Sequence, residues 1–174
     1  MASETARYQH LTTRYCEGCG IDVGSQGSPV VPWAWQLDLP PAEYSIYNGG
    51  AQLPGTVQLR GRGESLPVET GSLDFVYSSH LLEDFSDWKP LLSEWVRVLK
   101  PGGHLIILIP DKKLFAAAMA RGQIGNPAHK HEGRVGELTE YAAKFRLELI
   151  EDRLTGCFEN DYTILFVARK STCT

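Results

Sequence analysis

The chain has no apolar run long enough to cross a bilayer, since the longest is Leu105 to Ile109. Met1 to His10 is polar and lacks the apolar segment of a signal peptide. Charge of one sign is not in excess either: the net charge is −4 and no basic field points to nucleic acid or an anionic membrane. These absences predict a cytoplasmic protein with no membrane partner, and they disfavour nucleic acid as a binding partner.

Cysteine is too scarce for a disulfide framework. The four cysteines are Cys16 and Cys19, which form one C-x-x-C, and the separate Cys157 and Cys173. A C-x-x-C can be half of a zinc site or a redox pair, but a zinc site needs two further ligands at suitable spacing. The sequence therefore favours reduced, partly buried thiols and no metal.

The length of 174 residues and a hydrophobic content of 43% are ordinary for one globular domain. We expect residues 1–174 to form a single domain. Residues 1–14 are polar and form an N-terminal extension, either a short helix over a ligand cleft or a frayed end.

The most informative stretch is Gly71 to Asp111. It predicts a buried strand over Leu73 to Tyr77, an amphipathic helix from about Trp88 with Lys100 in its last turn, and a second strand over Leu105 to Ile109. The second strand is apolar without alternation, so helices must cover both faces of its sheet. This β-α-β unit should cross over in the right-handed sense.

The same stretch carries a resemblance to a known family, in the segments ESLPVETGSLDFVYSSHLLEDF and EWVRVLKPGGHLIILIP. From about Tyr15 to Lys170, the chain resembles the class I S-adenosylmethionine-dependent methyltransferases of the small type 11 branch. The resemblance implies an α/β, Rossmann-like fold. Its mostly parallel sheet should have seven strands or fewer, helices on both faces and an antiparallel last strand. The implied cofactor is S-adenosylmethionine.

The family places a glycine-rich turn after the first strand and an acid at the end of the second. Here the first strand leads into Gly24, and the second ends near Asp38. Glycines let the backbone approach a nucleotide, and the acid accepts hydrogen bonds from ribose hydroxyls. Asp22 should either orient the loop or approach the methionine ammonium group. The predicted cofactor-binding residues are Asp22, Gly24, Ser25, Gly27, Asp38, Leu39, Gly63, Glu64, Ser65, Leu66, Ser78 and Ser79.

Three departures from the family pattern support a different interpretation. Gln26 stands where a second glycine is expected, and a positive φ there costs about 1–2 kcal/mol. Arg62 replaces the usual adenine-accepting Asp, and a guanidinium cannot accept. The nine residues between Gly24 and Ala34 are too few for a full crossover helix. The alternative to an enzyme is therefore a catalytically inactive methyltransferase-like binding or regulatory protein.

The acceptor side of the site should lie after the fourth strand. His80 is the candidate catalytic base there, or else a packing residue that shapes the pocket. Glu83 and Asp84 are interpreted as solvated residues ahead of the helix. Further along, His129 and His131 are substrate-side candidates. They belong to a basic set that favours a solvated loop or, alternatively, an anionic acceptor: Lys112, Lys113, His129, Lys130, His131 and Arg134. The sequence thus predicts methyl transfer to an unidentified small molecule, and it leaves the oligomeric state open, a homodimer included.

Overall fold

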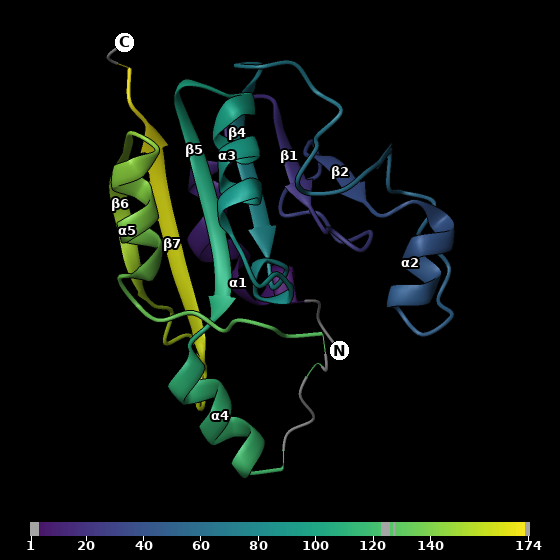
Figure 1. Cartoon of the computed structure of the whole chain (residues 1–174), viewed down its shortest axis with the longest axis vertical. Coiled ribbons are helices and arrows are strands. Elements are labelled where there is room, and N and C mark those ends of the chain that lie inside the picture. The colour runs from purple at the N-terminus through teal and green to yellow at the C-terminus, as the bar shows by residue number, and fades with distance from the viewer. Residues whose placement is uncertain (1–3, 123–125, 127, 173–174) are drawn as a thin grey trace.

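The computed structural model describes residues 4–122, 126 and 128–172, and its centre is a seven-stranded sheet (Figure 1). The strand order is β3-β2-β1-β4-β5-β7-β6. The strands are β1 Gly20–Val23, β2 Trp35–Asp38, β3 Leu59–Arg60, β4 Leu73–Ser79, β5 Leu99–Pro110, β6 Leu147–Leu154 and β7 Thr163–Lys170. Neighbours among β1 to β5 pair in parallel, whereas β7 runs antiparallel to both β5 and β6. The predicted α/β sheet with an antiparallel last strand is confirmed.

Helices cover both faces of this sheet. They are α1 Glu4–Thr12, α2 Pro41–Tyr47, α3 Lys89–Val98, α4 Lys112–Ala120 and α5 Glu137–Lys144, with short 3-10 turns at η1 Thr13–Tyr15 and η2 Leu82–Asp84. Figure 1 shows α3 and α5 in front of the sheet and α1 behind it, while α2 and α4 project beyond the sheet. No helix in the part of the chain that the structure describes is long and apolar enough to cross a membrane.

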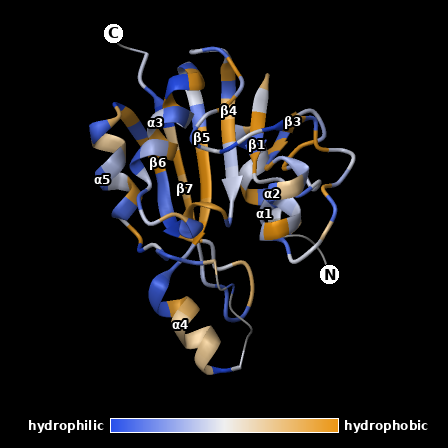
Figure 2. Ribbon diagram, turned by 45° about the vertical axis from the view of Figure 1, so that its right-hand side comes forward, coloured by the Kyte–Doolittle hydropathy of each residue, from blue (hydrophilic) through white to orange (hydrophobic). Residues whose placement is uncertain are grey.

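The central strands are apolar on both faces, as the unbroken run in β5 predicts. Leu105, Ile107 and Ile109 enter the core beneath α3 and α5, whereas Ile106 and Leu108 enter a second core beneath α1. Figure 2 shows β5 and β7 as apolar strands at the centre of the molecule. Burial of both faces fixes the sheet between two helical layers.

The crossover helix expected between the first two strands of such a sheet is absent. Residues 24–34, all of which the structure describes, form turns and bends. Instead, α1 and the segment around Val30 and Val31 cover this face, and Tyr8 is buried within the second core. The Tyr8 hydroxyl also lies 2.7 Å from Thr163 Oγ1 on β7. The N-terminal segment from Glu4 is therefore a packed helix, and it covers the sheet face that the short connection leaves open.

Two predicted boundaries are wrong. The helix α3 ends at Val98, so Lys100 lies in β5 rather than in a last helical turn. The Pro101-Gly102-Gly103 segment belongs to the same strand and lies where the pairing of β4 with β5 is irregular. A Cβ on Gly103 would lie 3.0 Å from the carbonyl oxygen of Asp74. The run Val57-Gln58-Leu59 predicts the third strand, but β3 contains only Leu59 and Arg60.

Candidate active site

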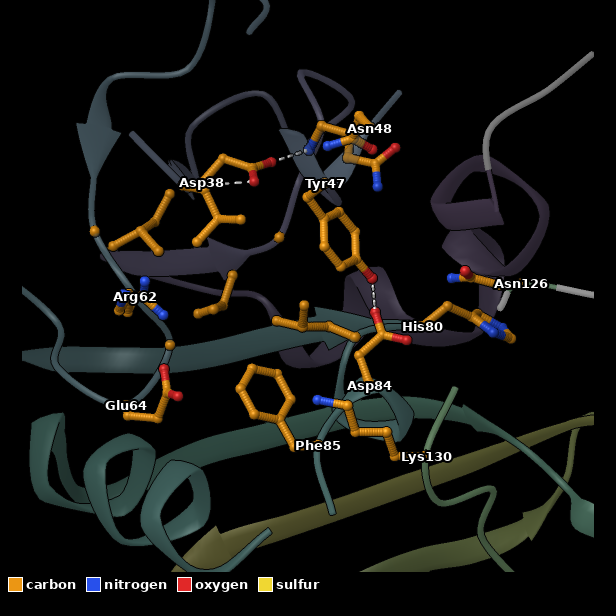
Figure 3. Close-up of a pocket in the computed structure, with 18 residues that line it drawn as sticks. Asp38, Tyr47, Asn48, Arg62, Glu64, His80, Asp84, Phe85, Asn126 and Lys130 are labelled. Carbon is orange, nitrogen blue, oxygen red and sulfur yellow. Dashed lines mark hydrogen bonds between the residues drawn. The ribbon is translucent and has the colours of Figure 1, made fainter. Parts of the chain in front are cut away.

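A cavity of about 480 Å³ lies at the carboxyl ends of the parallel strands, between β1, β2 and β4 (Figure 3). This volume is within the range typical of small-molecule sites. Asp38, Arg62 and Glu64 lie toward one end of the cavity, and His80 and Asn126 toward the other. The lining residues are Val23, Gly24, Gln26, Leu37, Asp38, Leu39, Tyr47, Asn48, Gly61, Arg62, Gly63, Glu64, His80, Leu81, Asp84, Phe85, Asn126 and Lys130.

The turn after β1 is built from left-handed residues that Asp38 holds in place. Gly24, Gln26 and Gly27 have φ values of +80°, +49° and +78°. The Asp38 carboxylate accepts from the N–H groups of Gln26 and Leu39, each at 2.9 Å. Burial raises the pKa of Asp38, and these two backbone donors oppose that rise. The strained Gln26 is thus compensated by a charge-assisted hydrogen bond from the same residue.

Asp22 lies behind this turn rather than in the cavity. Its side chain is 1% exposed, and Oδ2 accepts from the Val30 N–H at 2.7 Å. Burial raises the pKa of Asp22 to about 8. Of the two roles predicted for Asp22, this contact matches the orientation of the loop. Ser25 is also buried, with its hydroxyl 3.4 Å from Gln36 Oε1, and Gly27 packs closely against Pro54.

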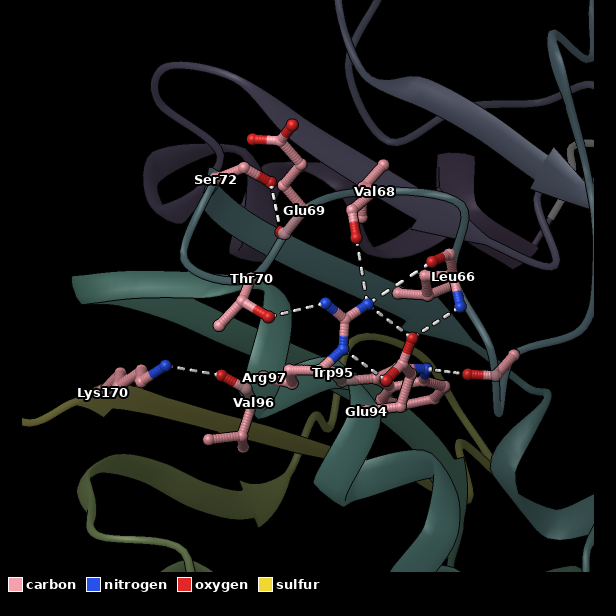
Figure 4. Close-up of polar contacts among 11 residues, drawn as sticks. Leu66, Val68, Glu69, Thr70, Ser72, Glu94, Trp95, Val96, Arg97 and Lys170 are labelled. Carbon is pink, nitrogen blue, oxygen red and sulfur yellow. Dashed lines mark hydrogen bonds and ion pairs between the residues drawn. The ribbon is translucent and has the colours of Figure 1, made fainter.

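The connection after β3 forms another wall, which α3 holds from behind (Figure 4). Trp95 Nε1 donates to the Gly63 carbonyl at 2.9 Å. The Arg97 guanidinium donates to the Val68 carbonyl at 3.0 Å and to Thr70 Oγ1 at 2.9 Å, and it pairs with Glu94. The geometry of this wall therefore depends on helix residues that do not line the cavity.

Arg62 lines the cavity but directs its guanidinium to Glu43 on α2, with which it forms an ion pair. Both side chains are largely exposed. Solvent screens such a pair, so we assign it little stability. Its consequence is geometric, because it joins α2 to the wall formed by the β3 connection.

His80 lies at the opposite end of the cavity, in a left-handed backbone conformation with φ of +50°. Its Nδ1 lies 3.2 Å from Oε1 of Glu83, and its Nε2 lies 3.2 Å from the Thr163 hydroxyl. Glu83 is fully buried, and His129 Nε2 lies 3.6 Å from the same carboxylate oxygen. The interpretation of Glu83 and Asp84 as solvated residues is wrong, since Asp84 is only 8% exposed.

Asp84 on η2 contacts Tyr47, which belongs to α2. Its Oδ2 accepts from the hydroxyl of Tyr47 at the end of α2, which places this bond on the His80 side of the cavity (Figure 3). Burial is the largest cause of a raised pKa for both side chains. The contact joins η2 to α2 through the cavity.

The structure brings six predicted site residues together around this cavity: Gly24, Asp38, Leu39, Gly63, Glu64 and His80. The others lie outside its lining: Asp22, Ser25, Gly27, Ser65, Leu66, Ser78, Ser79, His129 and His131. Ser78, for example, donates its hydroxyl to the Val23 carbonyl at 3.0 Å, and Leu66 is part of the core. Their roles in binding stay predictions.

Sequence reasoning missed Tyr47, Asn48 and Asp84 as lining residues. Asp84 follows a strand that ends at the cavity, and this position was the available signal. No comparable signal existed for Tyr47, which reaches the cavity through the placement of α2. Of the basic set, only Lys130 lines the cavity. His131 pairs with Glu137 at 2.7 Å and Arg134 with Glu140 at 2.8 Å.

The three cysteines that the structure describes, Cys16, Cys19 and Cys157, do not gather into a site. Cys16 is buried, its thiol donates to the Thr12 carbonyl, and burial raises its pKa to about 12. Cys19 is exposed and Cys173 lies outside the described residues. Among the residues that the structure describes, no three His, Cys, Asp or Glu side chains are grouped to hold a metal ion.

Comparison with known proteins identifies the family. A family model described as a methyltransferase domain, of type 11, matches residues 21–107. These residues contain Asp38, His80 and the two glycine-rich walls of the cavity, which are the turn at Gly24 and the connection at Gly63. The chain belongs to this methyltransferase family. The methyl donor implied for it is S-adenosylmethionine. The cavity fits such a cofactor, since Gly24 and Gly63 allow close backbone approach and the buried Asp38 carboxylate retains lone pairs for hydroxyl groups.

Relatives include a phthiotriol/phenolphthiotriol dimycocerosates methyltransferase of Mycobacterium leprae, 41% identical over 69 residues, which are 40% of this chain and 26% of that protein. A probable S-adenosylmethionine-dependent methyltransferase of Mycolicibacterium smegmatis is 30% identical over 112 residues, 64% of this chain and 42% of the relative. The chain thus spans between a quarter and less than half of the length of these two relatives.

Solved structures show the same fold. A methyltransferase from Thermotoga maritima, described as a possible histamine N-methyltransferase, superposes with a TM-score of 0.69 at 19% identity, covering 95% of this chain and 88% of that one. A methyltransferase from Aquifex aeolicus gives a TM-score of 0.65 at 16% identity, covering 94% and 89%. At these identities the likeness concerns the fold alone.

Proposed function

We propose that this protein transfers a methyl group from S-adenosylmethionine to a small-molecule acceptor. The observation that carries the proposal is one cavity with two chemically different ends, Asp38 with the glycine-rich walls at one and His80 with buried Glu83 at the other. The first end suits a nucleoside, and the second offers a group able to accept a proton.

The residues of the first end would hold the cofactor. Asp38 would accept from ribose hydroxyls while its backbone bonds keep the turn at Gln26 in place. Backbone groups of Gly63 and Glu64, which line the same end of the cavity, would bind the adenine in place of the acceptor that Arg62 cannot provide. When bound, the cofactor supplies a methyl carbon that its sulfonium has already activated.

At the second end, we assign His80 the role of orienting the acceptor and taking its proton. The Glu83 carboxylate lies 3.2 Å from Nδ1 and would stabilise the positive charge that the ring gains with a proton. We assign Nε2 as the nitrogen that takes this proton, and in the free protein it contacts the Thr163 hydroxyl. The apolar Leu81 and Phe85 line the same cavity and exclude water from the acceptor.

The experiment combines cofactor binding with turnover. S-adenosylhomocysteine should bind in isothermal titration, and a panel of small acceptors should release S-adenosylhomocysteine from S-adenosylmethionine. His80→Ala should leave cofactor affinity nearly unchanged and lower turnover by about 10²–10⁴ if His80 is a general base. His104→Ala is the control, since His104 lies on β5 outside the cavity lining and is not a predicted site residue. Full turnover in His80→Ala would exclude His80 from the chemistry.

The alternative of a binding protein without turnover is favoured by one observation, the left-handed Gln26 at the cofactor turn. Binding of S-adenosylhomocysteine with no methyl transfer to any acceptor would support it. Absence of cofactor binding would contradict methyl transfer and leave the inactive binding or regulatory protein.

A further inference from the structure

The acceptor end of the cavity contains a buried carboxylate oxygen with no partner. Asp84 Oδ2 accepts from Tyr47, but Oδ1 is buried and has no hydrogen-bond partner among the residues that the structure describes. Figure 3 shows this carboxylate in the cavity, with Lys130 beside it on the wall. Lys130 attracts the carboxylate through space without an ion pair to it.

An arrangement of this kind is costly in the free protein. A buried polar atom without a partner costs about 1–3 kcal/mol, and more for a charged group. Natural proteins rarely leave such atoms unpaired unless a ligand or water completes the site. The Tyr47 hydroxyl satisfies one oxygen only, so the other is available to a hydrogen-bond donor that enters the cavity.

Charge indicates which donor fits. The cavity wall carries three carboxylates, those of Asp38, Glu64 and Asp84. The basic side chains in the lining are Lys130 and Arg62, and Arg62 is already paired with Glu43. A buried carboxylate is best compensated by a cation that also donates a hydrogen bond. A hydroxyl would supply the donor without the charge, and an anionic acceptor would supply neither.

We propose that Asp84 binds the acceptor and that the acceptor is a primary or secondary amine, held as its ammonium by Oδ1. This inference rests on the proposed function. The ammonium must first lose a proton, which passes to His80 Nε2 at the same end of the cavity. The nitrogen lone pair then forms the N–C bond as the C–S bond breaks, and the bonding pair remains on sulfur. The product is the methylated ammonium.

Matched acceptors test this inference. The probes are 2-phenylethylamine with 2-phenylethanol and phenylacetate, and butylamine with butanol and butyrate. Binding to protein saturated with S-adenosylhomocysteine is measured by titration, and turnover with S-adenosylmethionine is measured separately. The amines should bind at least about tenfold more tightly than their alcohols and carboxylates, a difference of about 1.4 kcal/mol, and only the amines should be methylated.

Variants of Asp84 and of its neighbours test whether Asp84 is the residue that binds the amine. Asp84→Asn keeps the shape and a contact to Tyr47, and it should raise the KM for amines at least about tenfold, with kcat changed less than about threefold. Asp87→Asn is the control, since Asp87 is exposed, lies outside the cavity lining and caps the Lys89 N–H. Tyr47→Phe removes the hydroxyl that donates to Oδ2, leaves Oδ1 unchanged and should not weaken amine binding. A thermal melt of each variant checks that it is folded.

Three results would overturn the inference while leaving methyl transfer intact. One is equal binding of amines and alcohols, or binding of neither amine. Another is an unchanged KM in Asp84→Asn. A third is a loss of S-adenosylhomocysteine affinity in Asp84→Asn with no loss for 5′-methylthioadenosine, which lacks the amino-acid part, because Asp84 would then bind the cofactor's own ammonium. By contrast, wild-type protein that binds no S-adenosylhomocysteine would contradict the proposed function itself.

Discussion

At the scale of single residues, the turn after β1 shows how a lost glycine is tolerated. Gln26 adopts the left-handed conformation that the missing glycine would have adopted freely. The cost is about 1–2 kcal/mol for an ordinary side chain. A hydrogen bond to a charged group contributes about 1.5–3 kcal/mol, and Gln26 N–H makes one to Asp38. The two magnitudes are comparable, so this departure alone does not abolish the turn.

Asp38 should therefore matter for cofactor binding. Asp38→Ala removes the acceptor of the ribose hydroxyls and should weaken S-adenosylhomocysteine binding by about 10- to 150-fold, as measured by titration. Asp74→Ala is the matched control. Asp74 also accepts a backbone bond, from Cys19, but lies at the start of β4 away from the cavity. Equal affinities of the two variants would remove Asp38 from the site.

Gln26→Gly should relieve backbone strain. We expect the free energy of unfolding to rise by about 0.5–1 kcal/mol, since part of the relief is offset by the greater freedom of glycine in the unfolded chain. Arg146→Gly, at φ +55° between α5 and β6, should give a similar gain. Urea denaturation measures both.

The variants Gln26→Gly and Arg146→Gly also distinguish an effect of backbone strain on stability from an effect on cofactor binding. Cofactor affinity should change less than about threefold in Gln26→Gly, because the turn already has the required conformation. A gain of more than tenfold would instead favour the binding protein with an impaired cofactor site.

At the scale of elements, secondary structure that depends on local sequence patterns was predictable, whereas the packing of segments far apart in the sequence was not. The amphipathic face of α3 was predicted correctly, because Leu91, Leu92 and Trp95 recur at helical spacing and are buried. The absence of a crossover helix followed from the short connection before Ala34. The covering of that sheet face by α1 did not follow, because Tyr8 packs against strands that come much later in the chain.

The α3 helix should influence the cavity without lining it. Arg97→Met removes the hydrogen bonds that hold the connection between β3 and β4. It should lower the free energy of unfolding by about 2–3 kcal/mol and weaken S-adenosylhomocysteine binding several-fold. Arg169→Met is the control, since the exposed Arg169–Glu148 pair should contribute less than about 1 kcal/mol. A destabilised Arg97→Met protein with unchanged affinity would show that the wall does not depend on this helix.

At the scale of the whole molecule, the position of the site was predictable and part of its chemistry was not. Parallel strands bring their carboxyl ends to one edge, so Asp38 and His80 were expected there. Tyr47 meets Asp84 only because α2 lies over the cavity, and no local pattern encodes that placement. The burial of Glu83 likewise depends on His80 and on His129 from a distant connection.

Stability should depend on pH through Asp22. Its pKa is about 8 in the folded protein, against about 3.8 in the unfolded chain. Between these values the folded state holds a proton that the unfolded chain has released, so stability falls as pH rises from about 4 to about 8.

Asp22→Asn keeps an oxygen for the Val30 N–H and cannot ionise. Its free energy of unfolding, measured in urea at pH 5 and pH 8, should fall less than that of the wild type by at least about 1 kcal/mol. The comparison is between slopes, because the amide changes stability at every pH. Parallel pH profiles would show that Asp22 ionises freely in the folded protein.

The contact between Tyr8 and Thr163 spans 155 residues and has a consequence for biosynthesis. At about 5–20 residues per second, the ribosome makes Thr163 roughly 10–30 s after Tyr8. During that interval α1 has no β7 to dock on, and the apolar face around Phe75 and Tyr77 is incompletely covered. Thr163 also contacts His80, so the His80 end of the cavity is assembled last. We therefore expect nascent chains that stop before β7 to be held by chaperones and to lack a formed His80 end of the cavity.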